Sequence, residues 1–113
     1  MNEPGTLSHG AGGMLHIQVD TERYRIEADD VKTLLFYGRV VPILQERTAK
    51  RANGLLVSEI TIEGHAAINS SGKAVVCHTR VGSFIIPRVS FQRVARGEAV
   101  SAPLFPLLPG VTG

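Results

Sequence analysis

A chain of 113 residues that is 43% hydrophobic and carries a net charge of +2 is long enough for one domain with its own core and too apolar to be disordered throughout. The single cysteine excludes an internal disulfide and a cysteine-rich zinc module. No apolar run approaches the roughly 18 residues that a membrane span needs. No secretory leader is recognisable, so we expect a soluble protein of the cytoplasm.

The N-terminal part is expected to contain a polar segment and then a hairpin. Residues 1–13 include four glycines and few apolar residues, which predicts a disordered lead-in. The segments MLHIQVD and RYRIE alternate apolar and polar residues on either side of a polar stretch, residues 20–22. This alternation is typical of two half-buried antiparallel strands joined by a turn.

The following segment changes period. Val31, Leu34 and Leu35 have the i, i+3, i+4 spacing of one helical face, and Gly38 would end the helix, so a short helix is predicted over about residues 30–37. The next segment, RVVPILQE, is predicted as a strand. Its proline removes a ladder N–H and places the strand at an edge or a bulge. Residues 47–54 are basic, end in Asn-Gly and are expected to form an exposed loop.

The pattern from residue 55 to residue 81 predicts a long hairpin. Ile60, Ile62 and Ala66 alternate with polar residues and are expected to face the core. The polar segment NSSG is a turn sequence, and a symmetric hairpin over Ser70–Ser71 pairs residues whose numbers add to 141, so that every apolar position falls on one side. A second turn is predicted at residues 82–83.

The hairpin contains Cys77 and His78, the residue pair in this sequence that most resembles a metal-binding or catalytic pair. Neighbouring residues of a strand point to opposite faces, so Cys77 is predicted in the core and His78 on the outer side. The two side chains therefore cannot form a joint metal site or a catalytic dyad, and Cys77 is expected to be a structural, buried thiol.

The C-terminal part is predicted to contain one more strand and a tail. FIIPRVSFQRV has an apolar pattern that changes face near Pro87, which we interpret as a bulged strand. The prolines at 103, 106 and 109 have the three-residue spacing of polyproline II, with apolar residues between them. The expected domains are a lead-in over residues 1–13, a β-rich domain over 14–102 and a Pro-rich apolar tail over 103–113. The tail would pack on its own domain or bind another subunit or protein.

Charge and motifs suggest binding surfaces rather than a catalytic centre. Residues 1–63 carry nine acids and seven bases, whereas residues 64–113 carry one acid and five bases, so the second half could present a basic face unless the acids of the first half neutralise it. The chain has no Walker loop, G-x-G-x-x-G, nucleophile elbow or H-E-x-x-H. The candidate binding residues are Arg80, Arg88, Arg93, Arg96, Phe105 and Leu107. A polar cluster on the outer face is expected from Glu63, His65 and His78.

Together these patterns predict a mainly β domain, a small antiparallel barrel or sandwich of six or seven strands with one short helix. We predict no catalytic residue, no metal and no cofactor. The leading hypothesis is a non-enzymatic interaction module that binds a protein partner, or a second copy of itself, through basic hairpins and the Pro-rich tail. The alternatives are a nucleic-acid-binding β-barrel and a small enzyme or ligand-binding barrel.

Overall fold

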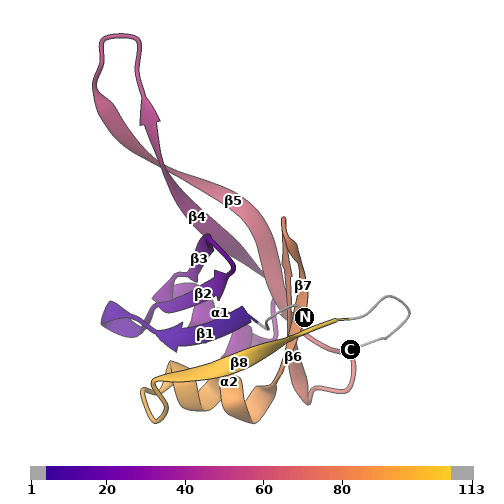
Figure 1. Cartoon of the computed structure of the whole chain (residues 1–113). Coiled ribbons are helices and arrows are strands. Elements are labelled where there is room, and N and C mark those ends of the chain that lie inside the picture. Colours follow the sequence, from indigo (N-terminus) through magenta and orange to yellow (C-terminus); the bar gives the residue numbers. More distant parts are fainter. Residues whose placement is uncertain (1–4, 108–113) are drawn as a thin grey trace.

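Eight strands, taken in chain order, form a closed antiparallel barrel in the computed structural model, which describes residues 5–107 (Figure 1). The strands are β1 (Gly5–His9), β2 (Leu15–Val19), β3 (Glu22–Ile26), β4 (Val41–Lys50), β5 (Leu56–Ile68), β6 (Ala74–Thr79), β7 (Gly82–Pro87) and β8 (Ser101–Pro106). A 3-10 turn, η1 (Ala11–Gly13), follows β1, and two helices, α1 (Ala28–Tyr37) and α2 (Arg88–Ala95), follow β3 and β7. The mainly β fold class is confirmed, with eight strands and two helices in place of six or seven strands and one helix.

The inward-facing residues of all strands and the apolar sides of both helices form one core. Buried residues alternate along β2, β3 and β7, as a strand with one face on a core requires. Each helix adds two fully or nearly fully buried side chains. The largest fully buried side chains are Tyr24, Phe91, Leu7, Leu15, Ile17, Ile26, Leu34, Ile43, Ile86 and Leu104. The barrel interior is therefore filled by side chains.

The chain is an internal repeat of two halves with the same element order, three strands, a helix and a strand. Residues of β2, β3 and α1 match residues 60 positions later in β6, β7 and α2, as in Leu15 and Val75, or Leu34 and Val94. The last strands of the two halves match through Val-Pro-Ile at 41–43 and Ala-Pro-Leu at 102–104. The β4–β5 junction is thus the counterpart of the β8–β1 junction, where the two ends of the barrel meet.

Both ends of the chain contribute to this closure, which corrects the expected domain boundaries. Residues 5–9 form β1, paired with β2 and β8, instead of a disordered lead-in. Residues 103–106 belong to β8, where Leu104 is fully buried, instead of to a separate tail. Pro103 and Pro106 therefore lie in a barrel strand and not in polyproline II, while Pro109 and residues 1–4 lie outside the described residues.

Helix α2 replaces the second part of the strand predicted at residues 84–94. Pro87 ends β7 and takes the N-cap position, and the chain turns into a helix at Arg88. Phe91, Val94 and Ala95 have i, i+3, i+4 spacing and face the core, whereas Val89 is exposed. The change of face near Pro87 was thus a change from strand to helix period and not a bulge. Helix α1 was placed correctly and begins two residues earlier than expected.

The β5–β6 hairpin has the expected faces but a different register. Ala66 pairs with Cys77 and Gly64 with Thr79, so paired numbers add to 143 rather than 141. The side-chain oxygen of Asn69 accepts hydrogen bonds from the N–H groups of Lys73 and Ala74 at 3.1 Å each, which supports a wider loop than a two-residue turn. A shift by two residues keeps every side chain on its face, which is why the alternation did not reveal it. In the following hairpin the turn lies at Arg80–Val81 rather than at residues 82–83.

Candidate interaction surface

β4 and β5 continue beyond the barrel as a two-stranded ribbon, here called the arm (residues 44–62), which rises away from the barrel in Figure 1. It begins at the Leu44–Ile62 pair and ends in a turn at residues 51–55, where Gly54 has a positive φ. The arm includes residues 47–50, which the sequence had indicated as loop. Apolar and polar residues do not alternate over this part of β4, because it carries the basic residues Arg47 and Lys50.

A register shift at the base of the arm decides which side chains become exposed. Ile43 pairs with Gly64, and the next residue, Leu44, pairs with Ile62, so Glu63 is an extra residue on β5. Such a bulge reverses the faces of the strand beyond it. Ile60 and Ile62, expected in the core, therefore lie on the outer side, 52% and 69% exposed.

The outer face of the arm combines an apolar row with a polar row. The β5 row contains Leu56, Ser58, Ile60 and Ile62, and the β4 row opposite it contains Leu44, Glu46, Thr48 and Lys50. Leu55 at the tip and Leu56 are also more than half exposed. Large apolar side chains gathered on one exposed face are typical of a contact surface.

Beyond Leu44, both long edges of the arm lack a strand partner among the described residues. β3 pairs with β4 only at Arg25–Leu44, and the pairing of β6 with β5 ends at Gly64. A two-stranded ribbon is at best marginally stable in water without further packing, and free strand edges can pair with other chains. The arm thus presents unpaired strand edges and an exposed apolar row in the described part of the chain.

A groove of about 410 Å³ lies between the arm and the outer face of β2 and β3. Its walls are His16, Arg23, Tyr24, Arg25, Leu44, Glu46, Thr48 and Ser58. Arg25 forms ion pairs with Glu27 at 3.1 Å and with Glu46 at 3.6 Å, which ties the barrel to the arm. Burial, and then the positive charges of Arg23 and Arg25, lower the pKa of His16, so this histidine is neutral at pH 7.

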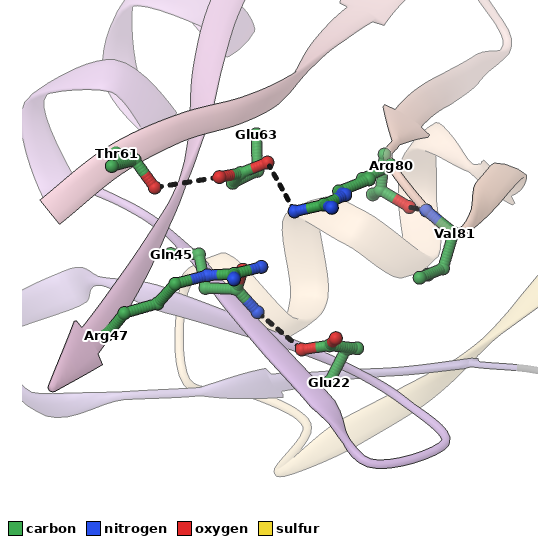
Figure 2. A network of polar contacts seen from close by, with 8 residues as sticks. Glu22, Gln45, Arg47, Thr61, Glu63, Arg80 and Val81 are labelled. Atoms are coloured by element: carbon green, nitrogen blue, oxygen red, sulfur yellow. Dashed lines mark hydrogen bonds and ion pairs between the residues drawn. The ribbon is translucent and has the colours of Figure 1, made fainter. Parts of the chain in front are cut away.

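A polar network fixes the base of the arm to both neighbouring hairpins (Figure 2). Gln45, which is buried, donates from Nε2 to Glu22 Oε2 at 2.7 Å and accepts at Oε1 from Arg47 Nε at 2.9 Å. On the other strand, Thr61 donates to Glu63 at 2.9 Å, and Glu63 lies 4.0 Å from the Arg80 guanidinium. These contacts orient the arm relative to the barrel, so its outer face has a defined direction.

The predicted polar cluster, Glu63, His65 and His78, lines one notch of about 460 Å³ where β5 separates from β6. His65 pairs directly with His78, and their ring centroids are 6.1 Å apart. His78 Nδ1 lies 2.7 Å from Ser83 Oγ, and Glu63 is engaged with Thr61 and Arg80. Within residues 5–107 no three His, Cys, Asp or Glu side chains are placed to hold a metal ion.

The four candidate arginines do not form one face. Arg80 lies at the β6–β7 turn beside Glu63, and Arg88 lies at the start of α2, where its guanidinium donates to the carbonyls of Leu35 at 3.2 Å and Gly72 at 3.3 Å. Arg93 and Arg96 are exposed on α2 and at its C-cap. Arg88 therefore connects α1 to the β5–β6 loop instead of facing a ligand.

The candidate residues of the C-terminal segment also lie apart from the arm. Phe105 pairs with Ile85 on the outside of the barrel and is about half exposed, and Leu107 is half-buried with its N–H bonded to the Ser83 carbonyl. Cys77 is fully buried, as predicted, and burial raises the pKa of its thiol to about 12.

Sequence reasoning missed the outer face of the arm, above all Leu55, Leu56, Ile60 and Ile62. The alternation from residue 56 to residue 68 is unbroken in type, because the bulged residue is Glu63 and the next is a glycine. The signal that the sequence did offer was the length of the alternating segment that forms β5, because this segment is much longer than the one that forms its partner β6.

Comparisons with known proteins identify no relative: no family model, no curated protein and no solved structure matches this chain. None of the helices described between residues 5 and 107 is both long and apolar enough to cross a membrane.

Proposed function

We propose that this chain is a non-enzymatic interaction module whose contact surface is the outer face of the arm. The observation that carries the proposal is the exposed apolar row Leu56, Ile60 and Ile62 on a ribbon with two free edges. We favour the arm over the basic hairpins and the Pro-rich tail as the contact, because the arginines are dispersed and residues 103–106 belong to the barrel.

The length of the β4–β5 pairing supports a role of the arm in contact rather than in closing the barrel. This pairing continues from Leu44–Ile62 to Lys50–Leu56, beyond the last pairs of the two strands with β3 and β6. Exposed apolar side chains on this extension lower solubility unless they bind something.

Site-specific photo-crosslinking in the native host tests the proposal. A photoreactive amino acid is introduced at Ile60 or Ile62, and in parallel at Arg93 on α2 as a matched exposed control. We expect defined crosslinked species from the arm positions and none from the control. Equal or absent crosslinking at all three positions would contradict the proposal, whichever protein were the partner.

A nucleic-acid contact is a second candidate, favoured by Arg47, Lys50 and Arg51 on the arm. Two-stranded ribbons can enter a groove of duplex DNA, and phosphate contacts would make binding strongly salt-dependent. The opposing observations are the pairing of Arg47 with Gln45 and the 4.0 Å approach of Arg51 to Glu59. Anisotropy of a labelled duplex between about 50 and 200 mM salt separates the two, since the protein-contact proposal expects no saturable binding.

An enzyme or a ligand-binding barrel is less well supported, because side chains fill the barrel and the two described hollows are open and lie outside it. We place the module in the cytoplasm, in line with its free thiol, which a reducing compartment maintains.

A further inference from the structure

The outer face of the arm is self-complementary about one point, the Thr48–Ser58 pair. On β5, Leu56 and Ile60 each lie two residues from Ser58. On β4, Glu46 and Lys50 each lie two residues from Thr48, and they carry opposite charges. The residues at the centre are small and hydroxylic, so a second sheet can approach closely there.

A two-fold axis through this point brings matching side chains together. Consider an axis that lies in the plane between two stacked arms and is perpendicular to their strands. A rotation of 180° about this axis reverses the strand direction and places β4 of one copy over β4 of the other, and β5 over β5. Residues equally far from the axis exchange places. Ile60 then packs on Leu56 of the second copy, and Glu46 faces Lys50 of the second copy, each contact occurring twice.

The charges of this face disfavour other alignments of the two stacked arms. A shift that places Glu46 over Glu46, or Lys50 over Lys50, brings like charges together, which is unfavourable in an interface. All four side chains of the complementary set are exposed, so none must leave an existing core site to make the contact.

The groove beside the arm provides the space that such packing needs. Thr48 and Ser58, at the centre of the face, form one of its walls, and Arg23 and Arg25 of β3 form another. With strands reversed, the arm tip of the second copy, residues 51–54, lies over Leu44 and Ile62 at the inner end of the groove. Stacked sheets are separated by about 10 Å, so the groove must remain open for the second arm.

We propose that the occupant of the arm's outer face is a second copy of this chain, packed face to face about a two-fold axis through Thr48 and Ser58. This inference rests on the proposed function and makes it specific. It assigns the contact to a symmetric dimer in which two Glu46–Lys50 pairs set the register and the apolar row provides the buried surface.

A charge-exchange series measured by sedimentation equilibrium tests the dimer. The intact chain is expected at twice 12.1 kDa. Glu46→Lys and Lys50→Glu each turn two attractive contacts into two repulsive ones, so each should raise the dissociation constant by about tenfold. The double variant, Glu46→Lys with Lys50→Glu, restores both intermolecular pairs in exchanged positions but still lacks the Arg25–Glu46 ion pair, so it should recover most of the affinity that the single variants lose.

Arg93→Glu is the matched control, because Arg93 is an exposed residue of α2 and does not belong to the outer face of the arm. It should leave the dimer intact. Circular dichroism of each variant confirms that the barrel is folded.

A monomeric intact chain at every concentration, a dimer indifferent to the single changes, or a double variant that fails to recover would each overturn the inference. The proposed function is judged separately. If the intact chain is monomeric but Ile60 and Ile62 crosslink to a different protein, the arm is still the contact surface and only the identity of its occupant is wrong. If neither a dimer nor an arm crosslink is found, both fail.

Discussion

Gly64 lies at the point where the arm leaves the barrel, and its lack of a side chain permits β5 to approach β6 closely there. A Cβ added to Gly64 would overlap the carbonyl oxygen of His78 on the neighbouring strand. The counterpart in the first half, Gly5, has more room, with the Gln18 carbonyl oxygen 3.2 Å from the same position. The backbones of neighbouring strands therefore approach each other closely at the matching glycines of both halves, and the approach is closest at Gly64, at the base of the arm.

Gly64→Ala should destabilise the fold by about 1–3 kcal/mol, because β5 and β6 must separate to admit the methyl group. Gly5→Ala should cost less. Chemical denaturation of both variants checks the order, and an unaffected Gly64→Ala chain would mean that the strands are not in contact there.

Arg88 was a candidate for ligand binding, and its contacts assign it a structural role. Its guanidinium donates to two backbone carbonyls, those of Leu35 and Gly72, that come from different parts of the fold. Arg88→Ala should lower the free energy of unfolding by about 1–3 kcal/mol. Arg93→Ala, on the exposed side of the same helix, should change it by less than about 0.5 kcal/mol. Equal effects of the two changes would refute the structural role.

Cys77 gives the stability of the chain a defined pH dependence. The pKa of the folded thiol is about 12 against an ordinary value of 9.0, so above pH 9 the unfolded chain binds fewer protons than the folded one. The free energy of unfolding should therefore fall as pH rises above about 9, whereas below that pH the thiol has no effect. Cys77→Ala should flatten this decline in melting temperature, and an identical decline in both chains would contradict the burial of the thiol.

At the scale of elements, the sequence predicts on which face of a strand a side chain lies better than it predicts with which residue of the next strand it pairs. Alternation placed Cys77 inside and His78 outside correctly, because the side-chain period of a strand survives a shift of two residues. The same property concealed the true register of β5 and β6. Hydrophobic type alone also failed at Ile60 and Ile62, since a bulge at Glu63 reverses the face without changing the pattern of letters.

The misassigned segments α2, β1 and β8 share a physical cause. In α2, Val89 and Phe91 have the spacing of a strand whereas Phe91 and Val94 have that of a helix, and the tertiary core selects the helix by burying Phe91 and Val94. In β1 and β8, short segments rich in glycine or proline have little propensity for a strand. They form strands because each pairs with the other end of the chain, a contact that no local pattern encodes.

At the scale of the whole molecule, the two similar halves close the barrel by joining the ends of the chain. A chain ending at Ala102 would lack Leu104, which is fully buried, and the pairing of β8 with Gly5 and with Phe84. We expect this truncation to abolish cooperative thermal unfolding, because β7 would lose both of its pairs with β8 and β1 would lose two of its four. A sharp transition near the original temperature, followed by circular dichroism, would be incompatible with closure through β8.

The arm extends beyond the barrel, and we assign it to contact and not to stability. The most direct measurement is the melting temperature, at a concentration at which the intact chain is monomeric, of a chain in which residues 48–58 are replaced by an Asn-Gly turn. This change keeps Arg47 and the polar network at the arm base and removes the centre and tip of the outer face. We predict that the shortened chain melts within a few degrees of the original and does not form the crosslinks expected at Ile60 and Ile62 of the intact arm. A large fall in melting temperature would show that the arm is part of the folding core and would contradict its assignment as a contact surface.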